Sequence, residues 1–182
     1  MFGSLKRRKA QKERAEALYW ACVEQARTPA FYTDFGVPDT LDGRFELITL
    51  HAGLLIRRLN AEGETGKAVA QDVFDAMFRE LDSALREMAV GDMSVGKKIK
   101  AMGEAFYGRM KAYDDGLSAG DPRQLDAAFA RNLLGEDVSE AEARPLSDYA
   151  IAVQASLAGQ DGETLMFGGR PQFAAVPVRA GA

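Results

Sequence analysis

The sequence predicts an all-α protein: a single-domain, irregular bundle of about six to seven helices, with a central helical hairpin and a flexible C-terminal tail. Three observations lead to this prediction. Apolar residues recur at spacings of three and four through most of the chain, as they do on one face of an amphipathic helix. No stretch keeps the strict apolar–polar alternation of a strand. Capping residues, glycines and prolines separate the apolar stretches, as at the ends of helices.

Residues Lys6–Thr28 are expected to form the first helix, because good helix formers dominate them. The helix opens on a basic segment within residues 1–14, whose cations are Lys6, Arg7, Arg8, Lys9, Lys12 and Arg14. Positive charge at a helix N-terminus opposes the helix dipole, so these residues do not stabilise the helix. The segment is either a solvated end, a contact for an anionic membrane surface, or a contact for ribosomal RNA. Tyr19 and Trp20 are expected in the core or at its edge.

A connector bounded by prolines follows at residues 29–39. It contains three aromatic side chains, at Phe31, Tyr32 and Phe35, which need burial. The connector therefore either covers the core or forms part of a peptide-binding edge.

The helix expected at Thr40–Asn60 is the most apolar of the chain and is predicted to be central. His51, the single histidine, falls on its apolar side, near Leu47 and Leu54. A hydrogen-bonded core histidine is the predicted role, because a metal site needs several ligands and the sequence offers no second histidine.

Residues 61–67 are predicted to form a linker. The run Asp72–Arg109 then predicts two amphipathic helices joined by a turn at residues 91–94, with the second helix ending across residues 114–120. This hairpin is rich in methionine, whose flexible side chain adapts to varied apolar partners. Its methionines and phenylalanines either fill the core or line a groove.

Three shorter features complete the domain. Asp121 and Pro122 predict a helix start, and Ser139 with Glu142 predicts a capping box. Pro145 is expected to end that short helix before a last one begins at Ser147. Residues 1–158 are thus predicted as the helical domain, and residues 159–182, which contain several glycines and prolines, as a mobile tail.

Composition narrows the class of protein. The chain has 182 residues, 47% of them hydrophobic, and a net charge of −4, which disfavours a general DNA or RNA binder. A single cysteine, Cys22, fits a reducing compartment. No apolar run is long enough to cross a bilayer, and no signal peptide is recognisable. The expected location is the cytoplasm, or the periphery of the inner membrane on its cytoplasmic face.

The sequence predicts no enzyme. No Ser/His/Asp or Cys/His set has a recognisable spacing, and no glycine-rich nucleotide cradle precedes a helix. Neither a cofactor, a metal ion nor a small-molecule substrate is expected. Asp75–Arg79 and Asp82–Arg86 are spaced for ordinary ion pairs on a helix.

Several words of the sequence resemble the ubiquinol–cytochrome c chaperone family. They are Phe-Asp-x-Met-Phe at residues 74–78, Gly-Asp at 91–92, Val-Gly-Lys-Lys at 95–98 and Ala-Phe-Tyr-Gly-Arg at 105–109, with FELITLHAGLLIRRL upstream at 45–59. The resemblance covers about residues 26–134. It implies an assembly factor that binds newly made cytochrome b and helps build the quinol–cytochrome c oxidoreductase, respiratory complex III.

Under this reading an apolar client segment would lie in a groove between helices. From motif position and helix phase, the predicted groove residues are Phe74, Met77, Phe78, Met102, Phe106 and Tyr107. The predicted polar rim consists of Asp82, Asp92, Lys97, Lys98 and Arg109. Two alternatives remain: a ribosome- or RNA-associated factor that uses the basic segment, and an enzyme with an unrecognised site.

Overall fold

The computed structural model describes residues 2–88, 91–119, 121–135 and 137–177, with side chains from residue 6 onward except at residues 92 and 93. Within these ranges the structure is helical and contains no strand, which confirms the predicted all-α class. The elements, in chain order, are α1 (Phe2–Ala26), α2 (Ala30–Thr33), α3 (Leu41–Asn60), α4 (Gly63–Glu87), α5 (Asp92–Ala119), α6 (Pro122–Phe129), the π-helical segment η1 (Ala130–Leu134), α7 (Glu140–Ala158) and α8 (Gly162–Phe167).

The eight described α-helices exceed the predicted six to seven, because two short ones lie in segments expected to be irregular. The first, α2, lies in the proline-bounded connector. The second, α8, lies within residues 159–182.

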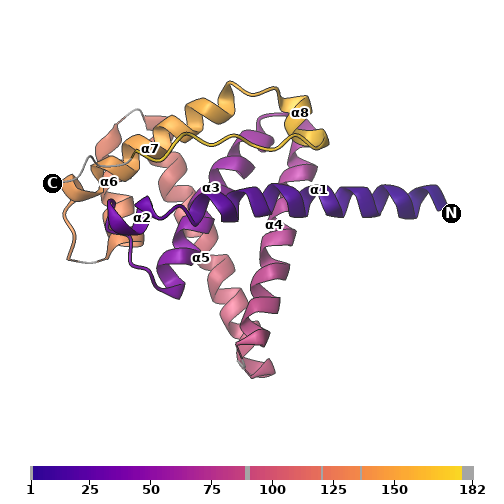
Figure 1. Ribbon diagram of the computed structural model, residues 1–182, viewed down its shortest axis with the longest axis horizontal. Helices are drawn as coiled ribbons and strands as arrows, with labels where there is room; N and C mark the ends of the chain where they lie inside the picture. Colours follow the sequence, from indigo (N-terminus) through magenta and orange to yellow (C-terminus); the bar gives the residue numbers. More distant parts are fainter. Residues whose placement is uncertain (1, 89–90, 120, 136, 178–182) are drawn as a thin grey trace.

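Helix α3 is the centre of the bundle, as predicted. It contacts α1, α4, α5, α7, α8 and η1, which surround it (Figure 1). The Thr40 hydroxyl accepts a hydrogen bond from the Gly43 N–H (3.1 Å) and so caps the start of the helix. Leu47, Leu50, Leu55 and Leu59 have no exposed surface, so this helix supplies much of the hydrophobic core.

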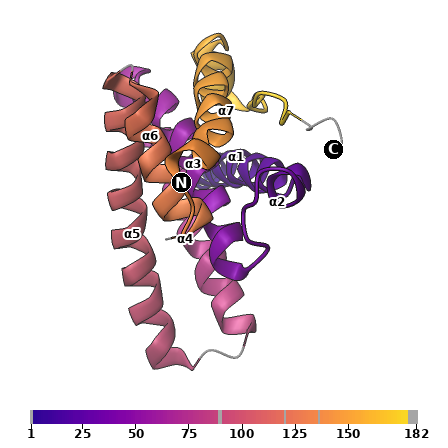
Figure 2. The same ribbon diagram turned by 90° about the vertical axis from the view of Figure 1, so that its left-hand side faces the viewer.

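Helices α4 and α5 form the predicted hairpin. They contact one another and leave the body of the bundle side by side, so the end of the hairpin lies away from the other helices (Figure 2). Near the body, the hairpin packs on α1 and α3. Its far end, at the bottom of Figure 2, extends beyond them.

The predicted linker at residues 61–67 is wrong. Helix α4 begins at Gly63, which has a positive φ of 71°, so α3 and α4 are joined by a tight turn. Gly66 lies against the end of α3, and a Cβ atom there would be 2.1 Å from the Leu59 carbonyl oxygen. The two glycines therefore allow α3 and α4 to meet closely. From the sequence alone, the same glycines predict a loop.

Helix α5 continues to Ala119, so Gly116 is inside the helix and does not end it. A Cβ atom at Gly116 would lie 3.1 Å from the Leu125 backbone nitrogen, which shows how closely α5 packs on α6. The missing side chain at Gly116 lets α5 and α6 pack closely.

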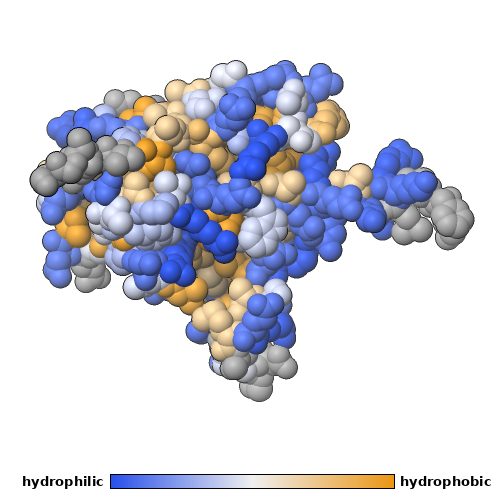
Figure 3. Space-filling model, viewed as in Figure 1, coloured by the Kyte–Doolittle hydropathy of each residue, from blue (hydrophilic) through white to orange (hydrophobic). Residues whose placement is uncertain are grey.

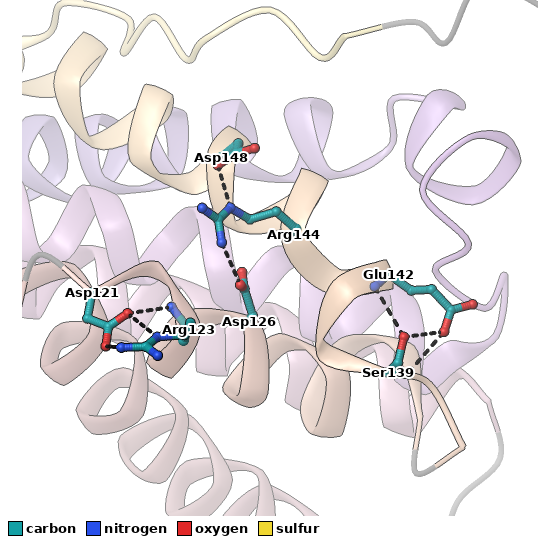
Figure 4. A network of polar contacts seen from close by, with 7 residues as sticks. All are labelled: Asp121, Arg123, Asp126, Ser139, Glu142, Arg144 and Asp148. Atoms are coloured by element: carbon teal, nitrogen blue, oxygen red, sulfur yellow. Dashed lines mark hydrogen bonds and ion pairs between the residues drawn. The ribbon is translucent and has the colours of Figure 1, made fainter.

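Local signals at α6 and α7 are confirmed (Figure 4). The Asp121 carboxylate accepts from the Arg123 N–H (3.1 Å), and Ser139 and Glu142 form both bonds of a capping box. Arg144 of α7 donates to the buried Asp126 of α6 (3.0 Å) and so links the two helices.

The expected helix end at Pro145 is wrong, because α7 runs through it. Proline inside a helix costs about 3 kcal/mol relative to alanine. Directly after it, α7 buries Leu146, Tyr149 and Ala150 against the rest of the bundle, and this packing outweighs the lost hydrogen bond.

Residues 168–177 form an extended C-terminal segment that passes back along α7 (Figure 1). The Gln160 amide binds both the N–H (2.9 Å) and the carbonyl (2.7 Å) of Gln172, and the Gln25 amide donates to the Ala174 carbonyl (3.1 Å). Leu165 and Met166 of α8 are buried in the core. The predicted mobility of residues 159–182 stays a prediction, and these contacts are the ones it would have to break.

Candidate functional site

An apolar groove lies between the body of the bundle and the hairpin. It has a volume of about 910 Å³ and collects side chains from the first four helices and α5. We call it the hairpin groove; its apolar lining is Tyr19, Trp20, Val23, Ala26, Tyr32, Leu41, Phe45, Ile48, Leu81, Ala84, Leu85, Met88 and Met102. Hydrophobic side chains gather below α1, where the body meets the hairpin (Figure 3).

A second hollow of about 550 Å³ adjoins the groove and shares four residues with it: Leu41, Phe45, Leu85 and Met102. It extends the open surface toward α5 and η1. The two hollows are therefore neighbours that share part of their walls.

The groove leaves large apolar side chains uncovered. Trp20, Leu41 and Met88 are 42%, 55% and 54% exposed, and they are half of the six large exposed hydrophobic residues among those described. Beneath them the floor is closed, since Tyr19, Val23 and Phe45 are buried. Such a concentration of exposed apolar surface is typical of a protein interaction site.

Charged residues border the groove. Glu80 and Glu87 of α4 line the groove, as do Arg27 of α1 and an ion pair between Arg44 of α3 and Asp39 (2.7 Å). Charges so placed can orient a partner and raise its association rate more than they raise affinity.

The second hollow contains a partly buried ion pair that ties α5 to α3. The Arg109 guanidinium Nε lies 2.7 and 2.6 Å from the two carboxylate oxygens of Glu46. Burial raises the pKa of the Glu46 carboxyl, and the hydrogen bonds from Arg109 oppose that rise. Arg109, which was predicted as a rim residue, lines the second hollow and is held in place by its hydrogen bonds to Glu46.

The aromatic residues predicted for the groove meet one another. Phe74 lies 4.6 Å from Phe78, 5.3 Å from Phe106 and 5.5 Å from Tyr107, measured between ring centroids. Edge-to-face and tilted pairs at such distances add stability beyond their buried area. The four side chains therefore form an aromatic cluster that joins α4 to α5.

Of the six predicted groove residues, Met102 alone lines the hairpin groove. Met77 and Phe106 are fully buried and belong to the core, so their assignment to a groove is wrong. Phe74 and Phe78 are half-buried, and Tyr107 is 61% exposed beside a separate hollow of about 450 Å³ between α3 and α5. Helix phase identifies the apolar face of each hairpin helix, but it does not show which part of that face the body of the bundle covers.

The predicted rim residues are dispersed. Lys98 lines the second hollow with Arg109, and Lys97 is exposed near the start of α5. Asp82 pairs with Arg86 (2.7 Å), as its spacing predicted, whereas Arg79 pairs with Glu16 of α1. Asp92 begins α5, and its side chain lies outside the described residues.

The basic segment occupies the first half of α1. Its first five cations, Lys6, Arg7, Arg8, Lys9 and Lys12, are exposed. Arg14 is half-buried, 3.9 Å from Asp72 and stacked 5.8 Å from the Phe167 ring centroid. Arg14 therefore belongs to the body of the bundle.

Sequence reasoning missed most of the groove lining, in particular Tyr19, Leu41, Phe45, Leu85 and Met88. One signal pointed there: the aromatic connector expected either to cover the core or to edge a peptide site. Both uses occur, because Phe31 and Phe35 are buried and Tyr32 lines the groove.

His51 has the predicted core role. Its Nδ1 donates to the Leu47 carbonyl (2.7 Å), and its Nε2 accepts from the Tyr149 hydroxyl (2.8 Å), which in turn accepts from the Gln25 amide (2.9 Å). Burial lowers the pKa of His51 to about 4. The ring is therefore neutral at pH 7 and serves as a link between α1, α3 and α7.

Within the described ranges, no three His, Cys, Asp or Glu side chains are grouped as metal ligands would be. Nor does any helix in those ranges combine the length and apolarity needed to cross a bilayer.

Comparison with known proteins assigns the family. The family described as ubiquinol-cytochrome C chaperone matches residues 33–173, which include α3 to α8 and most of the hairpin groove. The chain belongs to this family. The match continues past residue 134, where the resemblance in the sequence ended, through α7 and α8 and into the C-terminal segment.

Individual members of the chaperone family agree. The chain is 29% identical to the ubiquinol-cytochrome-c reductase complex assembly factor 1 of Xenopus laevis, over 84% of this chain and 76% of that protein. It is 28% identical to the human protein of that name, over 84% of this chain and 51% of the relative. It therefore spans about half the length of the human relative.

A solved structure has a similar fold. A crystal structure of the Cbp3 homolog from Brucella abortus superposes with a TM-score of 0.84 at 34% identity, covering 97% of this chain and 98% of that one. The arrangement of helices that forms the groove is thus shared with that protein.

Proposed function

We propose that this protein is an assembly chaperone that binds newly synthesised cytochrome b and promotes assembly of ubiquinol–cytochrome c oxidoreductase, respiratory complex III. Family membership supports the assembly role, because relatives carry the name of assembly factors for that complex. The observation that carries the binding role is the hairpin groove, with Trp20, Leu41 and Met88 exposed along it.

The groove suits an apolar helical segment. A helix presents its side chains every three or four residues over a width of about 10–12 Å, and an apolar groove between helices is a common receptor for it. Met88, directly after α4, and Met102 of α5 both line the groove and can adapt to clients of different shape. Unassembled membrane segments are clients of this chemistry, because their apolar faces await partners.

The polar residues would set the direction of binding. Acidic Glu80 and Glu87 line the groove from α4 and basic Arg27 lines it from α1, whereas Arg44 is paired with Asp39. Lys98 adds a cation in the second hollow. In this proposal the half-buried Phe74 and Phe78, with the exposed Tyr107, offer a smaller second contact on the hairpin.

The proposal is tested by capture of the tagged protein from its own membranes in mild detergent, with mass spectrometry of what copurifies. We expect cytochrome b with the wild-type chain, and at least a tenfold loss in a Leu41→Glu/Met88→Glu variant. The matched control is Ile151→Glu/Phe167→Glu, which places the same charges on exposed apolar residues outside the groove. Charge reversal at Lys97 and Lys98 tests the rim separately.

Equal capture by the groove variant and the control would refute the groove as the client site. Enrichment of ribosomal proteins without cytochrome b would instead favour the ribosome-associated reading. That reading has one observation in its favour, the exposed cations at the start of α1.

A further inference from the structure

The charge of this chain is strongly divided. Residues 6–14 contain six basic and one acidic side chain, a net charge of +5, whereas the whole chain carries −4. The remainder therefore carries −9. We call residues 6–14 the basic arm.

The basic arm extends away from the body. Helix α1 is continuous from Phe2 to Ala26, and its first half projects past the other helices (Figure 1). The space-filling view shows the same projection, covered in hydrophilic side chains (Figure 3). The Gln11 amide then donates a hydrogen bond to Asp72 of α4 (2.7 Å), where the helix meets the body.

Most cations of the arm are exposed. Lys9 and Lys12 are 79% and 58% exposed, and they lie 3.6 Å from Glu13 and Glu16 of the same helix. Arg14, at the end of the arm, contacts Asp72 and Phe167 of the body. The exposed cations Lys6, Arg8, Lys9 and Lys12 are thus presented on the projecting part of α1 (Figure 1), where a partner outside the chain can reach them.

We propose that the basic arm docks this protein on an anionic lipid surface. A lipid surface attracts the arm and repels the body, so the charge division fixes the orientation of the molecule. Trp20 follows Lys9 by eleven residues, three helical turns, so both lie on one side of α1, roughly 16 Å apart. An exposed tryptophan beyond a row of lysines is the pattern of a helix that lies in a membrane interface.

The observations favour lipid over RNA. Residues 6–14 contain no aromatic side chain on which a base could stack. The exposed aromatic residue on the same side, Trp20, lies at the edge of the apolar groove and not among the cations. Docked in this way, the α1 edge of the hairpin groove would face the membrane.

The test is cosedimentation of the full chain with vesicles. Phosphatidylcholine vesicles that contain about one-third phosphatidylglycerol are compared with pure phosphatidylcholine, from about 50 to about 200 mM salt. The test variant combines Lys6→Gln, Arg8→Gln, Lys9→Gln and Lys12→Gln. The matched control neutralises three lysines and one arginine elsewhere on the surface: Lys67→Gln, Lys100→Gln, Lys111→Gln and Arg123→Gln.

We expect binding to the anionic vesicles alone, weakened by salt. Each arm cation is worth about fivefold in affinity, so the test variant loses on the order of several hundredfold and the control less than tenfold. Equal binding of both variants, or equal binding to neutral vesicles, would overturn the proposal. Binding of the wild-type chain to purified ribosomes but not to vesicles would overturn it too and assign the arm to RNA. The assay contains no client, so its failure is distinct from failure of the proposed function.

Discussion

On the side of α3 that faces α7, His51 has no exposed surface and both of its ring nitrogens are hydrogen-bonded. At the end of the same helix that borders the hairpin groove, Leu41 is 55% exposed and Ile48 half-buried. One helix thus contributes both to a closed core on the α7 side and to an open apolar surface at the groove. The difference indicates that stability is concentrated on the α7 side, while the groove side keeps apolar surface for a partner.

The largest expected effect compares two leucines of α3. Leu55→Ala removes a fully buried side chain and is expected to lower the free energy of unfolding by about 2–5 kcal/mol. Leu41→Ala removes a half-exposed one and is expected to cost less than about 1 kcal/mol. Urea denaturation measures both. Similar losses at the two positions would mean that the groove is closed in solution.

The closed side is also expected to respond to pH. The pKa of His51 is about 4 in the folded chain against 6.5 for an ordinary histidine, so the unfolded chain binds more protons between these values. Stability is therefore complete above pH 6.5 and falls by on the order of 3 kcal/mol as the pH drops to 4.

Nuclear magnetic resonance checks the pKa directly, because the chain has one histidine and hence one imidazole signal to follow. A titration midpoint near 6.5 would contradict a buried, neutral His51. Unfolding measured in parallel from pH 7 to pH 4 then gives the energetic consequence.

A smaller effect on stability is expected at the ion pair between Glu46 of α3 and Arg109 of α5. Arg109→Met leaves the Glu46 carboxylate partly buried without its partner and is expected to cost about 1–3 kcal/mol at pH 7. The cost should shrink toward pH 5, because burial favours the protonated form of Glu46. The double variant Glu46→Gln/Arg109→Met controls for the stranded charge, and it should recover part of the loss. A pH-independent cost would point to packing of the Arg109 stem instead.

The smallest effect on stability is expected at the rim of the groove. Met88→Gln replaces a 54% exposed side chain and should change the free energy of unfolding by no more than about 0.5 kcal/mol. Client capture should nevertheless fall, since the substituted side chain is apolar surface that a client would cover. A stable variant with undiminished capture would separate Met88 from the binding surface.

Local chemistry is what the sequence could predict. Asp121 and Ser139 cap their helices as predicted, because the hydrogen bonds involve neighbours two or three residues away. The burial of His51 also followed from its helix and its apolar neighbours. Pro145 misled the same reasoning, because tertiary packing of α7 overrides the local preference.

The groove could not be predicted, because it depends on where distant segments meet. Met77 and Phe78 are adjacent in sequence and share the apolar stripe of α4, yet Met77 is buried and Phe78 is half-exposed. Their burial depends on the helices that pack on α4, which include α1 and α3, through contacts such as Gln11–Asp72, 61 residues apart. Periodicity identifies the stripe of a helix but not the helix that covers it.

The C-terminal segment has a consequence for the order of synthesis. Gln25 of α1 donates to the carbonyl of Ala174, 149 residues later in the chain. At about 5–20 residues per second, that partner follows after roughly 7–30 s. Until then α1 lacks the segment that lies across it, and Tyr149, which joins it to His51, is also still to come. The closed side of the bundle is thus completed only after synthesis has passed Ala174.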